Sequence, residues 1–247
     1  MLSTGTRVAV SVAPRGAEEI PALYSEALSA GADLVELRLD ALASPDPGAV
    51  VGALGGLACD RLILTYRSRE EGGFGGPLDS RSVELLARAS DACPGSLLDA
   101  ELSGIRRLVP LRDLAASRGG SVIVSRHYAS PPSEEEAASD YREMLDFGRY
   151  AKLVFPASRH ADNALPIRLY GRLGRERLIS FCVGAKGVMS RLLSALLGAP
   201  IAYASLPGRP VAEGQLPPDE FAQLVEALAS VLGPRNGYLD RRALSRP

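Results

Sequence analysis

Lysine is rare in this chain, and Lys152 lies inside an apolar run. Of the 28 basic residues, Lys152 and Lys186 are the lysines and the rest are arginine. A guanidinium stays protonated, whereas a desolvated lysine can lose its proton and attack a carbonyl carbon. Burial of an ammonium within Tyr-Ala-Lys-Leu-Val-Phe is unfavourable, so Lys152 is predicted to be an imine-forming amine. The alternative is an outward-facing lysine that is covered by a helix and paired with an acid. Lys186, in a Gly-Ala-Lys-Gly loop, is predicted to be solvated.

A histidine directly follows a second apolar run. His127 ends the segment Val-Ile-Val-Ser-Arg-His, and an imidazole there can act first as a general base and then as a general acid. A packed or surface histidine is the alternative. His160, the other histidine of the sequence, lies in a polar turn and is predicted to be exposed.

Two charged residues alternate with leucines in Val-Glu-Leu-Arg-Leu. Alternate residues of a strand share one face, so Glu36 and Arg38 are predicted to point together into the protein. Buried charges are unfavourable unless they neutralise each other or bind a polar ligand. The pattern therefore leaves two alternatives open, a structural salt bridge and a ligand contact.

Three loops have compositions that suit ligand binding. The stretch from Arg67 to Gly76 contains two glycine pairs that allow close approach to a ligand, although a solvated charged loop is an equal alternative. Arg191 follows Gly-Val-Met-Ser at the start of an expected helix, where backbone N–H groups and a guanidinium can bind a carboxylate or phosphate. The long loop from Leu206 to Pro217 is predicted to be an active-site lid.

These residues lie in a regular alternation of short β-rich runs and longer amphipathic stretches. The expected strands are Arg7–Val12, Leu34–Leu39, Arg61–Tyr66, Ser96–Glu101, Ser121–Arg126, Ala151–Pro156, Leu178–Val183 and Ile201–Ser205. The expected helices are Ala17–Ala30, Gly48–Leu57, Ser80–Ala89, Ile105–Arg118, Ser133–Asp146, Asp162–Leu173, Val188–Leu197 and Pro218–Leu232. Eight β/α units predict a single-domain α/β protein, a closed (β/α)8 TIM barrel over residues 1–232, followed by a C-terminal extension over 233–247. An open doubly wound sheet is disfavoured because no dinucleotide or P-loop glycine motif follows a strand.

Charge and cysteine usage exclude several classes of function. A net charge of −1 gives no reason to expect nucleic acid or an anionic membrane as a partner. No apolar run is long enough to span a bilayer and no signal peptide is evident, so a cytoplasmic location is predicted. Cys59, Cys93 and Cys182 show no metal-binding spacing and are predicted to be three reduced, buried thiols, without a metal site.

Taken in order, these motifs resemble type I 3-dehydroquinate dehydratase from Arg7 to about Leu232. The matching set is Glu36-Leu-Arg38, Tyr66-Arg67-Ser with Glu71-Gly-Gly, Ser125-Arg-His127, Lys152, Gly187-Val-Met-Ser-Arg191 and Gly214-Gln215. The resemblance implies a TIM-barrel lyase of the shikimate pathway, which serves aromatic amino acid biosynthesis. Such an enzyme removes water from 3-dehydroquinate to give 3-dehydroshikimate, with no cofactor because the imine is the electron sink. Family members are often homodimers.

The resemblance also implies a role for each matching residue. Lys152 would form a Schiff base with the C3 ketone, and His127 would take a proton from C2 and deliver it to the departing C1 hydroxyl. Glu71 would orient His127 and raise its basicity. The implied substrate-binding residues are Ser11, Glu36, Arg38, Arg67, Arg191 and Gln215, with Arg191 on the carboxylate.

The sequence departs from the family pattern in the lid. Where the family has Ser/Thr-Ala-Pro-Gly-Gln, this chain has Val211-Ala-Glu213-Gly-Gln. Val211 has no hydroxyl and Glu213 adds a negative charge, so weaker substrate binding or a shifted lid is predicted, with the chemistry intact. Two other functions stay open: a class I aldolase on the same barrel, and an inert barrel that serves as a binding module.

Overall fold

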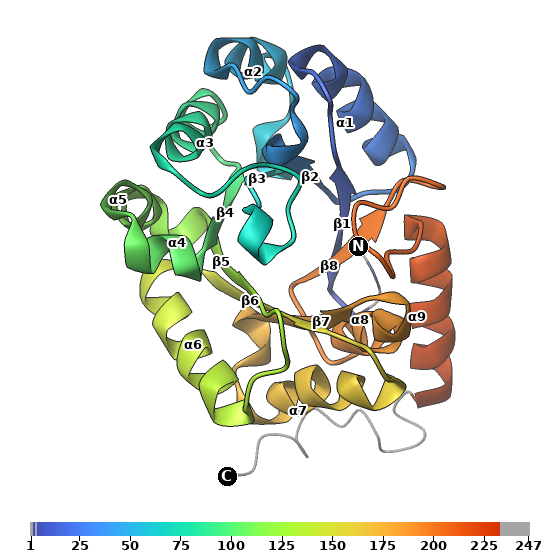
Figure 1. The fold of residues 1–247 in the computed structure, drawn as a ribbon. Coiled ribbons are helices and arrows are strands. Elements are labelled where there is room, and N and C mark those ends of the chain that lie inside the picture. The colour runs from blue at the N-terminus through green and yellow to red at the C-terminus, as the bar shows by residue number, and fades with distance from the viewer. Residues whose placement is uncertain (1, 3, 233–247) are drawn as a thin grey trace.

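The computed structural model describes residues 2 and 4–232, and the predicted extension over 233–247 lies outside them. A ring of strands is surrounded by helices (Figure 1). The strands are β1 (Arg7–Val12), β2 (Leu34–Arg38), β3 (Leu62–Thr65), β4 (Leu97–Glu101), β5 (Val122–His127), β6 (Tyr150–Pro156), β7 (Leu178–Val183) and β8 (Ile201–Ser205). The helices are α1 (Ile20–Ser29), α2 (Pro47–Leu54), α3 (Ser80–Ala92), α4 (Leu102–Arg107), α5 (Val109–Arg118), α6 (Glu134–Phe147), α7 (Ala164–Arg172), α8 (Val188–Leu196) and α9 (Pro218–Leu232).

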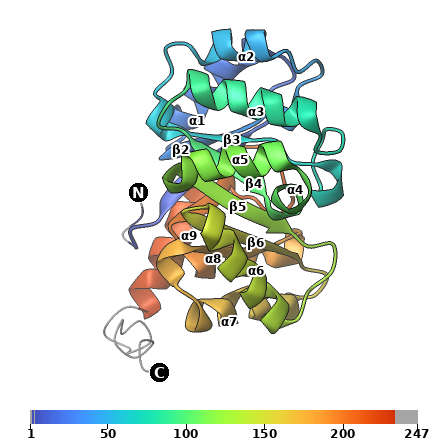
Figure 2. The same ribbon diagram turned by 90° about the vertical axis from the view of Figure 1, so that its left-hand side faces the viewer.

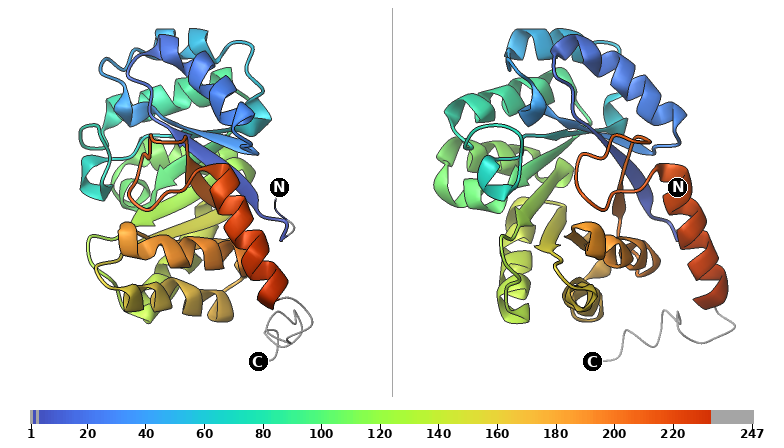
Figure 3. Two further views of the ribbon diagram at one scale, coloured as in Figure 1. Left: turned by 90° about the vertical axis from the view of Figure 1, so that its right-hand side faces the viewer. Right: turned by 45° about the vertical axis from the view of Figure 1, so that its right-hand side comes forward.

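The eight strands are parallel and form a nearly closed barrel. Their hydrogen-bonded order is β7-β6-β5-β4-β3-β2-β1-β8, so the ladder ends at β7 and β8. The side views show the helices as an outer layer, with α9 along the outside of β8 and α8 (Figures 2 and 3). The predicted single-domain (β/α)8 barrel is therefore confirmed for the described residues.

The barrel interior changes from apolar to polar along the strands. Toward the amino ends of the strands, the inward side chains form an apolar cluster of Ala9, Leu34, Ile63, Leu97, Ile123, Tyr150, Ile179 and Ile201. Two residues further along β2, β4 and β6, the same face carries Glu36, Asp99 and Lys152, which contact one another. Because alternate residues of a strand share a face, the strands that build the apolar layer also place the polar groups above it.

One predicted helix is two helices in the structure. The sequence pattern predicts a continuous helix over Ile105–Arg118, but α4 ends at Arg107 and α5 begins at Val109. Leu108 between them has extended backbone angles. Pro110, in the first turn of α5, has no N–H to donate to the carbonyl of Arg106, and its ring would clash with that carbonyl in a continuous helix.

Two cysteines form a disulfide, so the prediction of three reduced thiols is wrong for them. Cys59 precedes β3 and Cys93 follows α3, and their Cα atoms are 5.2 Å apart although 34 positions separate them in sequence. The β3–α3 unit folds back on itself and brings the two ends together, which spacing in sequence cannot reveal. Cys182 is free and buried, as predicted.

Reduction of this disulfide is expected to lower stability without affecting turnover. Opening a loop of this length releases denatured-state entropy that corresponds to roughly 3–4 kcal/mol. The free energy of unfolding, from denaturant titration with and without dithiothreitol, measures the effect. In a Cys59→Ala variant the reductant should have no further effect. An equal denaturation midpoint for oxidised and reduced wild-type protein would contradict the prediction.

Candidate active site

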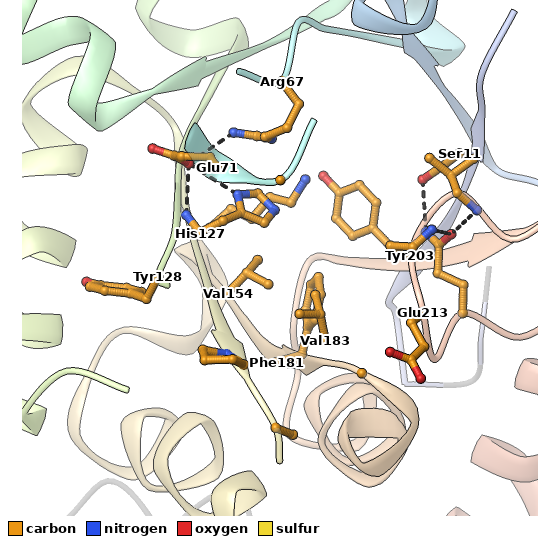
Figure 4. A pocket seen from close by; sticks show the side chains of 18 of the residues that line it. Ser11, Arg67, Glu71, His127, Tyr128, Val154, Phe181, Val183, Tyr203 and Glu213 are labelled. Carbon is orange, nitrogen blue, oxygen red and sulfur yellow. Dashed lines mark hydrogen bonds and ion pairs between the residues drawn. The ribbon is translucent and has the colours of Figure 1, made fainter. Parts of the chain in front are cut away.

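A cavity of about 740 Å³ opens at the carboxyl ends of the strands (Figure 4). Its lining includes every residue that the sequence singled out for the site: Ser11, Glu36, Arg38, Arg67, Glu71, His127, Lys152, Arg191 and Gln215. Parallel strands of a barrel direct their carboxyl ends to one side, and the loops that follow them enclose the space there. The structure therefore brings together residues that are up to about 200 positions apart in sequence.

Lys152 faces the barrel interior, so the outward-facing alternative is wrong. Its side chain is 4% exposed, and Nζ lies 3.3 Å from Glu36 Oε1 and 3.2 Å from Asp99 Oδ2. The ring centroid of Tyr203 is 3.9 Å from Nζ. Lys152 is buried as predicted, but its neighbours are two carboxylates and a ring rather than purely apolar groups. These neighbours stabilise a positive charge on the nitrogen.

Glu36 is held by hydroxyl donors as well as by the lysine. It accepts hydrogen bonds from Ser11 Oγ at 2.5 Å and from Thr65 Oγ1 at 3.1 Å. Burial alone would raise the pKa of Glu36, but the charges of Lys152 and Arg38 outweigh it and hold that pKa below its ordinary value. Glu36 is therefore an anion at neutral pH, and its two oxygens accept hydrogen bonds from Lys152, Ser11 and Thr65.

Arg38 does not pair with Glu36, so the structural salt bridge left open by the sequence is not formed. Its Nε and Nη2 donate to Asp40 at 2.9 and 2.7 Å, and Phe74 lies under the guanidinium, 5.1 Å away. Asp40 also accepts from the backbone N–H of Phe74 at 3.0 Å. Asp40 therefore ties the loop after β3 to Arg38 and fixes the direction of the guanidinium.

Arg67 joins three buried carboxylates beneath the cavity. Its Nη2 donates to Asp99 at 2.8 Å, and its Nη1 to Glu101 at 3.1 Å and Glu71 at 3.3 Å. Ser125 accepts a further hydrogen bond from Nη1 at 3.0 Å. A guanidinium with this many partners acts mainly to hold acids in place.

Asp99 and Glu101 are site residues that the sequence motifs did not single out. Both are about 1% exposed and alternate on β4, as Glu36 and Arg38 do on β2. Burial alone would raise the pKa of Asp99, but the charges of Arg67 and Lys152 lower it by more than burial raises it. The pKa therefore lies below its ordinary value, and Asp99 is an anion. The alternation of acids in Leu-Leu-Asp-Ala-Glu is the signal that could have found them.

His127 is positioned by Glu71. The backbone N–H of His127 donates to Glu71 Oε2 at 2.9 Å, and Nδ1 lies 3.3 Å from the same oxygen. The other oxygen of Glu71 accepts from Ser103 Oγ at 2.8 Å. A proton on Nδ1, shared with Glu71, leaves Nε2 as the basic nitrogen.

The net effect of the surroundings is to lower the basicity of His127, and an increase that comes from Glu71 stays a prediction. Burial, followed by the positive charges of Arg67 and Lys152, holds the pKa of His127 well below its ordinary value of 6.5. A desolvated imidazolium beside two cations is unfavourable, which outweighs the carboxylates nearby. His127 is therefore neutral at pH 7 and ready to accept a proton.

Arg191 has no ion-pair partner among residues 2 and 4–232. It is 4% exposed, its guanidinium lies 4.4 Å from the ring of Phe181, and Nη2 donates to the backbone oxygen of Glu213 at 3.5 Å. Within the described part of the chain, its buried Nε has no hydrogen-bond partner. Burial lowers the pKa of Arg191 to about 10. A buried cation that lines a cavity and lacks an acid is a site for a ligand anion.

Residues of the loop between β8 and α9, which the sequence predicts to be a lid, line one side of the cavity. Gln215 Oε1 accepts from the backbone N–H groups of Val211 at 3.0 Å and Ala212 at 2.9 Å, and its Nε2 donates to Ser11 Oγ at 3.1 Å. Gly214 has φ +84°, and a Cβ there would lie 2.6 Å from the oxygen of Gly184. Glycine is therefore required for the loop to lie this close to the end of β7.

The described residues contain neither a membrane-spanning helix nor a metal-binding cluster. None of the helices within the described residues is both long and apolar enough to cross a membrane. The same residues contain no group of three or more His, Cys, Asp or Glu side chains placed to hold a metal ion.

Comparison with known proteins matches this chain to one family. A family model for type I 3-dehydroquinase matches residues 8–231. The 3-dehydroquinate dehydratase of Thermococcus gammatolerans is 35% identical over 222 residues, which cover 90% of this chain and 98% of that protein. The enzyme of the same name from Methanothermobacter thermautotrophicus is 29% identical over 224 residues, 90% of this chain and 97% of that one.

Solved structures agree with the sequence comparison. The 3-dehydroquinate dehydratase of Aquifex aeolicus has a TM-score of 0.70 at 28% identity and covers 91% of this chain and 98% of its own. The Geobacillus kaustophilus enzyme has a TM-score of 0.77 at 22% identity, covering 92% and 91%, and so supports the fold alone.

Proposed function

The chain belongs to the type I 3-dehydroquinase family, and from this premise we propose that it dehydrates 3-dehydroquinate through an imine on Lys152 with His127 as the acid–base group. One observation carries the proposal. The buried amine of Lys152 shares a single cavity with the neutral imidazole of His127 and the unpaired guanidinium of Arg191. An amine, a base and an anion site together match a substrate that has a ketone, an acidic C–H and a carboxylate.

Each polar group of the proposed substrate has a matching side chain in the cavity. We propose that Arg191 binds the C1 carboxylate, where it would gain the partner it lacks. Ser11, Glu36, Arg38 and Gln215 line the same cavity, and we propose that they contact the ring hydroxyls. Arg67 was predicted to bind substrate, but its guanidinium is engaged by Asp99, Glu101 and Glu71, so we propose that it holds these acids in place.

The reaction begins with the lysine. Lys152 gives up a proton to Glu36, whose Oε1 lies within hydrogen-bond distance of Nζ, and the free amine attacks the C3 ketone. The carboxyl group returns that proton to the departing oxygen, and loss of water leaves a protonated imine, which withdraws electrons from the C2–H bond far more strongly than a ketone does.

His127 carries out the elimination. Its neutral imidazole takes the C2 proton, and the electron pair moves toward the imine nitrogen to form an enamine. The electrons then return to expel the C1 hydroxyl, and the imidazolium donates its proton to the departing oxygen. Hydrolysis of the imine releases 3-dehydroshikimate and restores Lys152.

A turnover assay tests the proposed function directly. Incubation of the protein with 3-dehydroquinate should produce a conjugated enone, observed as rising ultraviolet absorbance. Carbon–carbon cleavage products would instead support the aldolase alternative. No reaction by folded protein would support the inert barrel. The Glu71–His127 pair favours the dehydratase, as does Arg191, which has no ion-pair partner among the described residues.

The lowered pKa of His127 has a consequence for the pH dependence of turnover. A base is active when unprotonated, and a lowered pKa keeps it unprotonated further into the acid range. The ratio kcat/KM should therefore show no fall centred on the ordinary histidine pKa of 6.5 and should decrease only when the pH passes the lowered pKa. Initial rates across the acid range, with circular dichroism as a control for unfolding, check this. Half-maximal kcat/KM at or above pH 6.5 would contradict it.

The lid predicts that a restored hydroxyl strengthens substrate binding. Val211 lines the cavity and its side chain cannot donate a hydrogen bond. Val211→Ser should lower KM by about 3–10-fold, the effect of about one net hydrogen bond, at nearly constant kcat. Val211→Ala is the matched control, since it removes the same bulk without adding a hydroxyl. A KM that is unchanged or higher in Val211→Ser would show that the explanation is wrong.

Three further expectations from the sequence stay predictions. These are a place in the shikimate pathway, a homodimeric assembly and a cytoplasmic location.

A further inference from the structure

Tyr203 contacts the reacting nitrogen, although neither the sequence motifs nor the proposed mechanism gives it a role. It extends from β8 into the cavity (Figure 4). Its ring centroid lies 3.9 Å from Lys152 Nζ. The nitrogen is thus in contact with two different kinds of group, the carboxylates of Glu36 and Asp99 and one aromatic face.

The ring is held by packing and not by its hydroxyl. Tyr203 is 4% exposed and lies against Phe181, with ring centroids 5.9 Å apart and an interplanar angle of 43°. This contact bridges β7 and β8, where the strand ladder ends. The hydroxyl is buried and has no hydrogen-bond partner among the described residues. A phenylalanine would therefore keep the same position without leaving a buried hydroxyl unpaired.

We propose that Tyr203 is a further catalytic residue, whose ring face stabilises the positive charge on the Lys152 nitrogen in the protonated imine. The inference rests on the proposed function, because it requires that Lys152 forms an imine. The face of an aromatic ring carries negative potential and attracts a cation, most strongly where water is excluded. The 4% exposure of the Lys152 side chain meets that condition.

The ring does something that the neighbouring carboxylates cannot do. Glu36 and Asp99 stabilise the charge by accepting hydrogen bonds, so they share the same proton on which the electron-withdrawing power of the imine depends. An aromatic face stabilises the charge without accepting the proton. Burial, with the charges of Glu36 and Asp99, raises the pKa of the Tyr203 hydroxyl well above its usual value, so the ring stays neutral and cannot serve as a base either.

Two variants separate the ring from its hydroxyl. Tyr203→Phe keeps the ring and should leave kcat within about 3-fold of wild type, with equal or greater stability. Tyr203→Leu keeps an apolar side chain but removes the ring, and should lower kcat by about 30-fold while KM changes less. That factor equals about 2 kcal/mol at 1.36 kcal/mol per tenfold, the size of a desolvated cation–π contact. Equal losses in both variants, or none in Tyr203→Leu, would overturn the proposal.

A series without a change in shape guards against misfolding of Tyr203→Leu. Phenylalanine carrying one, two or three ring fluorines at position 203 progressively removes the negative potential of the ring face at nearly constant size. The logarithm of kcat should decrease steadily along the series. A kcat that does not depend on fluorination would overturn the role of the ring.

Trapping with borohydride separates this proposal from the function on which it rests. Reduction of wild-type protein in the presence of 3-dehydroquinate fixes any imine as a stable adduct. If wild-type protein gives no adduct, the proposed function itself fails. If the adduct forms and the fluorinated series turns over at an unchanged rate, only the role of Tyr203 fails.

Discussion

Lys152→Met is expected to lower kcat for 3-dehydroquinate by on the order of 10⁴-fold or more, as loss of a covalent nucleophile does in other enzymes. Without the amine no imine forms, and the C2–H bond is then acidified only by a ketone. The neighbouring carboxylates cannot replace the lysine, because neither forms an electron-withdrawing adduct. Initial rates measured as enone absorbance at saturating substrate quantify the loss.

The same variant should also unfold more easily, which requires a control. Methionine leaves Glu36 and Asp99 without the cation between them, and removal of one partner from a buried ion pair costs about 3–5 kcal/mol. Lys152→Arg keeps a positive charge but provides no nucleophile, so it should be more stable than Lys152→Met and equally inactive. Turnover by Lys152→Arg above about 1% of wild type would contradict the role assigned to the amine.

His127→Gln is expected to lower kcat by about 10²–10⁴-fold while imine formation continues. The imidazole acts on the C2 proton and the C1 hydroxyl, after Lys152 has already condensed with the ketone. Borohydride should therefore still trap an adduct in the His127→Gln variant, although turnover is slow. Rates and adduct masses measured on the same sample separate the two steps.

The exposed histidine of the chain offers a matched control. His160→Gln makes the same chemical change outside the cavity and should leave both kcat and trapping unchanged. If His127→Gln retains kcat within about 10-fold of wild type, the histidine is not the acid–base group. If His127→Gln shows neither turnover nor an adduct, the histidine is instead required before or during imine formation.

The positions of the site residues were predictable because barrel geometry depends on simple periodicity. Strands β1, β7 and β8 have the predicted bounds, and the other five differ by one residue at one or both ends. Since alternate strand residues share a face, Glu36, Lys152 and His127 could be assigned to one end of the barrel from the amino-acid sequence alone.

The contacts among these residues could not be predicted in the same way. Arg38 pairs with Asp40 and not with Glu36, because the loop after β3 folds onto Asp40 and fixes it. The carboxylates around Lys152 come partly from β4, where the alternation of acids marks Asp99 as inward-facing but does not show that it meets Lys152. Such pairings depend on which side chains meet across the barrel.

The basicity of His127 shows the same limit for electrostatics. The glutamate beside it suggests a raised pKa, but burial and the charges of Arg67 and Lys152 dominate. Likewise, the bond between Cys59 and Cys93 depends on how closely the ends of β3–α3 approach. In both cases the sequence contains the interacting groups, but the distances between them in the folded chain decide whether the pKa falls and whether the disulfide forms.

Peptide mapping after borohydride reduction tests the central claim most directly. Folded protein is incubated with 3-dehydroquinate and borohydride, digested, and analysed by mass spectrometry. A stable mass adduct of the substrate or product on the peptide that contains Lys152, and none on the peptide that contains Lys186, is the predicted result. Active protein that shows no adduct on Lys152, or an adduct only on Lys186, would contradict the account.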